Sequence, residues 1–113
     1  MPERSGIRLP FQIQVDYRID EDSDVLFTTD ISEHGLFLET VRPYPVGTKL
    51  ALCFNLPGII PTIHVVGEVM RVVVESDSQD VWQVPGMGVR FMSIDKPDRK
   101  AIRAFIRRAT GTG

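Results

Sequence analysis

Two arginines, Arg4 and Arg8, stand four residues apart just before the first clear apolar pattern of the chain. A guanidinium carries a planar fork of donors that grips a phosphate or the O6/N7 edge of a guanine, and its flat face stacks on a base. Gly6 lies between the two arginines and keeps the segment flexible. The pair therefore predicts a site for an anionic nucleotide, although paired arginines near a chain end are more often simply solvated.

A second polar group, Asp30, Ser32 and Gly35, occurs in the stretch DISEHG. Asp30 and Ser32 lie two residues apart, so on an extended segment both side chains point the same way. The carboxylate can accept from guanine N–H groups, the hydroxyl or backbone amides can donate to phosphate, and Gly35 permits a close backbone approach. Taken alone, the stretch equally fits an Asx or Ser turn that shapes a hairpin.

Composition limits the elements that can position these groups. The chain has 113 residues, 42% of them apolar, which is enough for one modest core and a single domain. Its formal net charge of −2 argues against binding nucleic acid or an anionic membrane by bulk charge. Cys53 is the only cysteine, so no internal disulfide can form, and a reducing compartment is expected.

Neither a signal peptide nor a membrane span is predicted. Residues 1–10 contain charges and proline where a signal peptide needs an unbroken apolar region. The longest run without charge, residues 50–67, is interrupted by two prolines, a glycine, an asparagine and a histidine, which excludes a spanning helix. We therefore expect a cytoplasmic protein without membrane insertion.

Alternation with a period of two predicts several half-buried strands. The clearest signals are Phe11, Ile13, Val15 and Tyr17, and later Leu50, Leu52, Phe54 and Leu56. The acidic residues 19–24 are expected to form a solvated turn. About six strands at regular spacing indicate a mainly β fold, a small antiparallel barrel or sandwich. The expected strands cover residues 11–18, 25–30, 35–41, 48–56, 62–75 and 81–92.

A helix is predicted to begin at Asp95, where the sequence DKPD supplies an N-cap residue, an acid three residues on and a proline in the first turn. Its apolar stripe should dock on the barrel. The basic residues form either a patch for a partner or a solvated face. The apolar positions are Ala101, Ile102, Phe105, Ile106 and Ala109. The basic positions are Arg99, Lys100, Arg103, Arg107 and Arg108.

Taken together, these features resemble the PilZ domain, a bacterial receptor module for cyclic di-GMP. Its two signatures, R-x-x-x-R and (D/N)-x-S-x-x-G, occur here in the right order, as Arg4 with Arg8 and as Asp30, Ser32 and Gly35. The stretch GMGVRF and a terminal helix complete the likeness, which covers nearly the whole chain. The resemblance implies a six-stranded antiparallel barrel with a C-terminal helix, and an arginine-bearing segment that closes over the nucleotide.

The resemblance also implies the roles of individual residues. Arg4 and Arg8 would grip guanine edges and phosphates, Asp30 and Ser32 would meet a guanine and nearby polar atoms, and Gly35 and Gly88 would lie near the ligand. The expected organisation is a flexible ligand-binding segment (1–10), the barrel with its helix (11–109) and a tail (110–113). Glu3 stands where many members carry a further arginine, which leaves the ligand stoichiometry open.

The leading hypothesis is a stand-alone cyclic di-GMP receptor without catalytic activity, metal or cofactor. It would be a monomer or homodimer that signals to an unidentified protein partner. Two alternatives remain, a PilZ-like scaffold that binds no nucleotide and a receptor for cyclic GMP-AMP. An enzyme is disfavoured because His34 and His64 have no nucleophile or ligand cluster beside them in the sequence. Binding of single-stranded nucleic acid is also disfavoured, because it would need a basic groove with exposed aromatic residues, whereas the net charge of the chain is negative.

Overall fold

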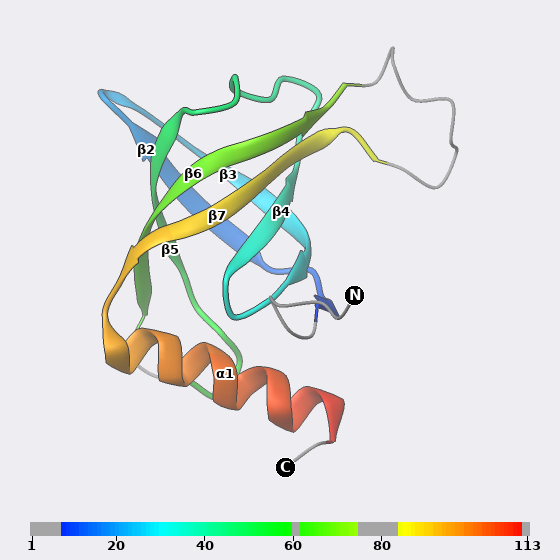
Figure 1. Cartoon of the computed structure of the whole chain (residues 1–113), viewed down its shortest axis with the longest axis vertical. Coiled ribbons are helices and arrows are strands. Elements are labelled where there is room, and N and C mark those ends of the chain that lie inside the picture. Colours follow the sequence, from blue (N-terminus) through cyan, green and yellow to red (C-terminus); the bar gives the residue numbers. More distant parts are fainter. Residues whose placement is uncertain (1–7, 60–61, 75–83, 112–113) are drawn as a thin grey trace.

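The computed structural model of the chain describes residues 8–59, 62–74 and 84–111 (Figure 1). These residues form one sheet and one helix, with seven strands among them. The elements are β1 (Leu9–Pro10), β2 (Gln14–Ile19), β3 (Asp22–Ile31), β4 (Gly35–Glu39), β5 (Lys49–Phe54), β6 (Ile63–Val73), β7 (Gly86–Ile94) and α1 (Lys96–Thr110).

The sheet closes into a six-stranded antiparallel barrel. Its strand order is β1-β3-β2-β5-β6-β7-β4, and an additional pairing between β3 and β4 joins the two ends. Closure leaves the main strands without a free edge. The very short β1 pairs with β3 at Ile31 and Asp30, beyond Phe27, where the pairing of β3 with the start of β2 stops. The predicted mainly β fold, a six-stranded barrel with a C-terminal helix, is confirmed.

The core follows the alternation that the sequence predicts. Leu50, Leu52 and Phe54 on β5 are each at most 2% exposed, while Lys49 and Ala51 between them face outward. Several expected bounds differ from the structure: the strand expected over 11–18 is β2, and the one expected over 81–92 is β7, with residues 81–83 outside the described ones. The acidic residues 19–24 differ in kind. The acidic stretch was predicted to be a turn throughout, but β2 continues into it and β3 begins within it.

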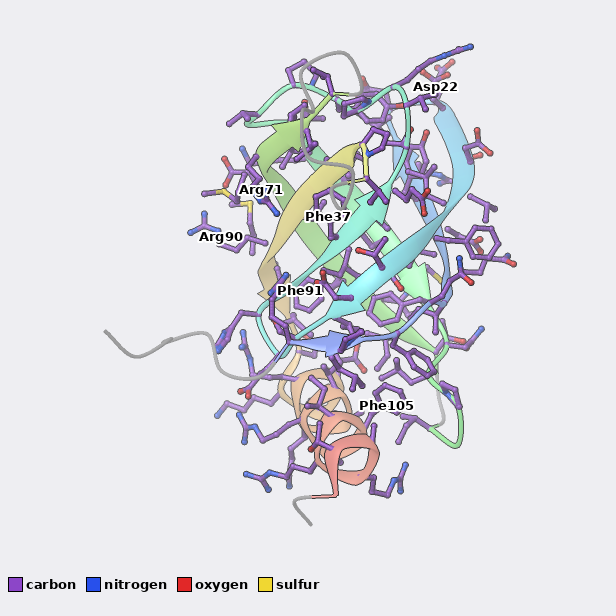
Figure 2. The ribbon with its side chains drawn as sticks, turned by 90° about the vertical axis from the view of Figure 1, so that its right-hand side faces the viewer. Asp22, Phe37, Arg71, Arg90, Phe91 and Phe105 are labelled. Carbon is purple, nitrogen blue, oxygen red and sulfur yellow. The ribbon has the colours of Figure 1, made fainter. Side chains whose placement is uncertain are left out.

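The correction at this hairpin has a local reason. Ile19 pairs with Asp22, so Asp20 and Glu21 alone connect the two strands. So tight a connection needs a positive φ, and Asp20 adopts a φ of 53°. Aspartate tolerates this conformation better than most residues. The acidic side chains are therefore carried by an extended hairpin, with Asp22 at the end of the barrel remote from α1 (Figure 2).

The helix packs under the other end of the barrel (Figure 1). Ile102, Phe105 and Ile106 are buried, and Phe105 meets Phe11 edge-to-face at 5.1 Å. Ala109 was expected in the same stripe but is exposed, because it lies in the last turn, beyond the residues that α1 buries. Among the described residues, no helix has the length and apolar character needed to cross a bilayer.

The start of α1 also differs in detail from the prediction. Asp95 is the N-cap residue, as expected, but its side chain makes no capping hydrogen bond. Instead, Asp98 in the first turn accepts a hydrogen bond from the backbone N–H of His64 at 3.2 Å. A carboxylate at this end is favoured by the helix dipole. The acid that was expected to complete the cap therefore joins the helix to β6.

Candidate ligand-binding site

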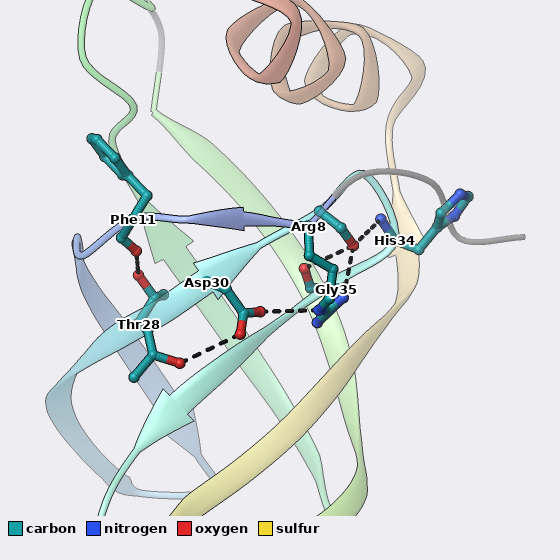
Figure 3. A network of polar contacts seen from close by, with 8 residues as sticks. Arg8, Phe11, Thr28, Asp30, His34 and Gly35 are labelled. Atoms are coloured by element: carbon teal, nitrogen blue, oxygen red, sulfur yellow. Dashed lines mark hydrogen bonds and ion pairs between the residues drawn. The ribbon is translucent and has the colours of Figure 1, made fainter. Parts of the chain in front are cut away.

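The short strand β1 places Arg8 beside the second motif. Leu9 pairs with Ile31, which brings the preceding residue against the end of β3. The Arg8 Nε donates to Asp30 Oδ1 at 3.1 Å, and Nη1 donates to Ser32 Oγ at 3.2 Å (Figure 3). Asp30 and Ser32, which follow Arg8 by 22 and 24 positions in the sequence, thus share its guanidinium. These contacts leave further N–H groups of the fork for a ligand.

Ser32 builds the turn between β3 and β4. Its backbone N–H donates to the Gly35 carbonyl at 2.8 Å, and its hydroxyl lies 3.3 Å from the same oxygen. The hydroxyl oxygen also accepts from the backbone N–H of His34 at 3.2 Å. With Arg8 as the second donor to this oxygen, the hydroxyl has used its one proton and both lone pairs. Ser32 is fully buried, so it acts on the site by shaping the turn and holding Arg8.

A bulge in β3 directs Asp30 outward. The register of β3 with β4 shifts between Thr28 and Asp30, so Thr29 is an extra residue. Without the bulge, strict alternation would place Thr28 and Asp30 on the same, inner face. With it, Thr28 and Ile31 are fully buried, while the Asp30 side chain is 30% exposed and meets Arg8. The bulge therefore positions the carboxylate of the motif.

The two glycines predicted near the ligand have different surroundings. A Cβ on Gly35 would lie 2.3 Å from the Val89 carbonyl oxygen, a backbone contact that cannot yield. A Cβ on Gly88 would lie 3.3 Å from Cγ of Arg71, a flexible side chain. Gly35 is thus required by the close approach of β4 to β7, whereas Gly88 leaves room beside an arginine.

Arg8, Ser32 and the two glycines line an open hollow of about 270 Å³ on the barrel wall, and Asp30 is joined to it through Arg8. Among the described residues that line it are three arginines and a histidine, and no carboxylate. Such a lining favours an anion in a chain whose formal net charge is negative. Figure 2 shows Arg71 and Arg90 projecting from the same side of the barrel. The lining residues are Arg8, Ser32, His34, Gly35, Met70, Arg71, Gly88, Val89 and Arg90.

Sequence reasoning missed Arg71 and Arg90. In β6 the residues Ile63, Val65 and Val69 face the core, so the same period would also turn Arg71 inward. A bulge between Val69 and Arg71 breaks the period and places Arg71 opposite Gly88, with its guanidinium carbon 5.3 Å from the centroid of the Phe37 ring. No sequence signal marks this bulge.

Arg90 could have been found from the sequence. Its neighbours Val89 and Phe91 are buried, so the period of two turns Arg90 outward. It pairs with Gly35 across the β4–β7 ladder, and its Nη2 donates to Glu68 Oε1 at 3.0 Å. The glutamate holds the guanidinium at the margin of the hollow, where its remaining N–H groups can reach an anion.

The motif turn is also joined to α1. Arg103 donates from Nε and Nη2 to Oε2 of Glu33, at 3.1 and 2.6 Å. The hydrogen bonds from Arg103 lower the pKa of Glu33 below its usual value, the charges of Arg103 and Arg99 act in the same direction, and partial burial opposes them. The backbone N–H of Phe91 donates to the His34 carbonyl at 2.8 Å. The turn is therefore held from two sides.

A second hollow, of about 580 Å³, lies between β2, β3, β5 and the start of β6. Asp16 and Asp24 line it together with Arg18, so among the described residues its carboxylates outnumber its guanidinium. An anionic ligand would be repelled there. The larger hollow is therefore the weaker candidate.

The structure brings Arg8, Asp30 and Ser32 into direct contact, and it sets Gly35 and Gly88 in the wall of the same hollow. Arg4 lies outside the described residues, so its position relative to Arg8 is not part of this geometry. The ligand-binding roles of all six residues remain predictions, as does the division into residues 1–10, 11–109 and 110–113.

Comparisons with known proteins bear on the family and the fold. The sequence matches the family described as PilZ domain over residues 2–108. No protein with a curated description matches it at a comparable level. Among solved structures, the inhibitor of motility MotI/DgrA of Bacillus subtilis superposes with a TM-score of 0.80 at 18% identity over 98% of this chain. The chain spans about half of that protein, 53% of its length.

Two further structures match at nearly full length on both sides. The PilZ domain of YcgR from Escherichia coli, solved with c-di-GMP, gives a TM-score of 0.69 at 16% identity, over 98% of this chain and 97% of that one. The PilZ domain of CeSA from a cellulose-synthesizing bacterium gives 0.61 at 14% identity, over 95% and 98%. At these identities the likeness establishes a shared fold.

Proposed function

The chain belongs to the PilZ domain family, and we propose that it is a receptor for cyclic di-GMP that acts through a partner protein. One observation carries the proposal: both halves of the family's motif pair that the structure describes, Arg8 on one side and Asp30 with Ser32 on the other, meet at a hollow lined by arginines. The ligand found in the PilZ domain of YcgR has the chemistry that such a lining suits.

Each group of the hollow has a part in this proposal. Arg8 and Arg71 supply donors and flat faces for phosphates and guanines, and Arg90 adds a third cation. Asp30 accepts from a guanine N–H, in exchange for or in addition to its bond with Arg8. A hollow of about 270 Å³ cannot enclose a whole cyclic dinucleotide, so affinity rests on a few directed contacts.

Binding would change the contacts of the motif turn. Arg8 cannot turn fully to a phosphate without loosening its bonds to Asp30 and Ser32. A ligand that recruits Arg8 therefore alters the chain around β1, and a partner that senses this surface can read the change. The proposal also places this receptor in the cytoplasm.

The test is calorimetric titration of the full chain with cyclic di-GMP, with cyclic GMP-AMP and GTP in parallel. Arg8→Ala should weaken binding about tenfold to hundredfold, the value of one good bidentate contact of about 1–3 kcal/mol. Arg18→Ala is the matched control, because Arg18 lines the larger hollow and its loss should leave affinity unchanged. A folded wild type that binds none of the three ligands would overturn the proposal in favour of a scaffold.

A further inference from the structure

The basic residues of α1 are concentrated on one flank of the helix. Five of its six lysines and arginines follow the spacing i, i+3, i+4, i+7 and i+11, which at 3.6 residues per turn puts them within about 100° of its circumference. We call these five residues the basic stripe. Its members are Lys96, Arg99, Lys100, Arg103 and Arg107.

The basic stripe is largely unneutralised. α1 has six basic residues and a single acid, Asp98, whereas the whole chain has 13 basic and 15 acidic residues. Among the described residues, Arg103 is the one member of the stripe with an ion-pair partner. The acidic hairpin around Asp22 lies at the other end of the barrel from Phe105 of α1 (Figure 2), so it cannot offset the stripe. The basic stripe is therefore a positively charged surface that a partner of opposite charge can bind.

Glu33 shows which chemistry the basic stripe accepts. The carboxylate of Glu33, from the turn between β3 and β4, takes two hydrogen bonds from Arg103, and Arg99 adds its charge. It is an internal carboxylate already seated on the stripe. Because large apolar side chains of α1 are turned to the barrel, the stripe offers nothing to insert into lipid. An acidic side chain is therefore the group that it fits best.

We propose that the basic stripe of α1 docks an acidic segment of a partner protein. The glutamate or aspartate side chains of this segment would bind the stripe as the carboxylate of Glu33 binds Arg103. The internal Glu33 competes with such a segment for Arg103. This inference concerns the partner of the proposed receptor but does not require the ligand. Its experiment is therefore run without cyclic dinucleotide, and its failure leaves the receptor proposal intact.

The test measures fluorescence anisotropy of a labelled Glu-rich peptide, with a Gln-rich peptide of the same length as control. Arg107 and Arg108 form a matched pair, because they are adjacent, exposed and alike, but Arg108 lies outside the stripe. Arg107→Glu should weaken peptide binding about fivefold or more at low salt, and Arg108→Glu less than about twofold. Glu33→Gln should strengthen it about twofold, since Arg103 loses its internal carboxylate.

Three results would overturn the proposal. Equal losses in Arg107→Glu and Arg108→Glu would mean that bulk charge binds the peptide. Tighter binding to vesicles of phosphatidylglycerol and phosphatidylcholine, or to oligothymidylate, would assign the stripe to a membrane or to nucleic acid. Absence of peptide binding by the folded wild type at low salt would leave the stripe as a solvated face.

Discussion

Two hollows of the barrel wall differ in their linings: the lining of one, of about 580 Å³, includes Asp16, Asp24 and Arg18, and the lining of the other, of about 270 Å³, includes three arginines. The larger offers more room, and the smaller offers convergent donors beside a turn. For a ligand with two phosphates, the sign of the lining charge decides, because like charges disfavour binding however large the space is. Volume alone would select the wall whose lining charge disfavours an anion.

The two hollows also differ in how firmly their polar groups are held. In the smaller one, Arg8 is fixed by Asp30 and Ser32, and Arg90 by Glu68. Around the larger one, the Tyr17 hydroxyl is hydrogen-bonded to Tyr44 at 3.3 Å, but among the described residues the charged Asp24 accepts only from the neighbouring N–H of Val25, a contact within its own strand. Groups that are already oriented lose less conformational entropy on binding. Preorganisation therefore favours the same wall as charge does.

The largest effect is expected from removing two cations of the smaller hollow together. Arg8→Ala with Arg71→Ala deletes two contacts of about 1–3 kcal/mol each, so affinity for cyclic di-GMP should fall about thirtyfold or more if the two losses add. The losses need not add, because the side chains share one ligand. Calorimetry of the double variant and of each single variant measures the effect.

The matched change in the larger hollow is Arg18→Ala. It removes the cation there, and affinity should remain that of the wild type. If Arg18→Ala weakened binding more than the double variant, the ligand would lie in the larger hollow and the comparison would be reversed.

The second effect separates the two glycines of the smaller hollow. Gly35→Ala forces a Cβ to within 2.3 Å of a backbone oxygen, so the free energy of unfolding should fall by about 1–3 kcal/mol. Gly88→Ala presses on the flexible Arg71 side chain and makes an ordinary contact with the Phe37 ring at 3.8 Å, so stability should change by less than about 0.5 kcal/mol while displacement of Arg71 weakens ligand binding a few-fold. Urea unfolding and calorimetry measure the two quantities. A large loss of stability in Gly88→Ala would argue against this distinction.

Where the strands are regular, the sequence was a sufficient guide. The period of two in Leu50, Leu52 and Phe54 predicted a buried face, and those residues are buried. The helix was predicted at Asp95 from its cap and its proline, and it begins there. In both cases a short, local pattern determines which face is apolar, and burial of that face is what stabilises the element.

The candidate site was harder to predict because two β-bulges build part of it. The bulge at Thr29 turns Asp30 outward, and the one next to Arg71 does the same for that arginine. A bulge depends on the register with a partner strand, which no local pattern encodes. The motif spacing identified Asp30 without its geometry, whereas Arg71 belongs to no motif and was missed. The prediction of a turn over the acidic residues 19–24 was wrong for a related reason, because cross-strand pairing extends the β2–β3 hairpin into them.

The third effect compares one serine from each hollow. Ser32→Ala removes a buried hydroxyl that holds Arg8, the His34 N–H and the turn, so unfolding free energy should fall by about 1–2 kcal/mol. Ser23 lines the larger hollow and is exposed, so Ser23→Ala should stay within about 0.5 kcal/mol of the wild type. Urea unfolding of the two variants measures this. Equal stability of both variants would mean that the turn does not depend on the Ser32 hydroxyl.

The smallest effect concerns the Arg103–Glu33 ion pair that links the motif turn to α1, whereas the larger hollow is joined to α1 by the hydrogen bond from the His64 backbone to Asp98. Arg103 lowers the pKa of Glu33, so the ionised carboxylate stabilises the folded chain at neutral pH. That stabilisation is complete above the usual glutamate pKa of 4.5 and is lost as the pH falls through the lowered value. Glu33→Gln should therefore reduce Tm at pH 7 by no more than about 3 °C, as expected of a partly exposed pair.

The pH dependence of that difference tests its cause. Thermal unfolding of wild type and Glu33→Gln, followed from neutral to acid pH, should give two Tm curves that approach each other below pH 4.5 and converge below the lowered pKa of Glu33, because both side chains are then neutral. A gap that persists at acid pH would mean that Glu33 acts through packing instead of charge. The arginines of the smaller hollow would then stay preorganised, but the motif turn would have no electrostatic connection to the helix.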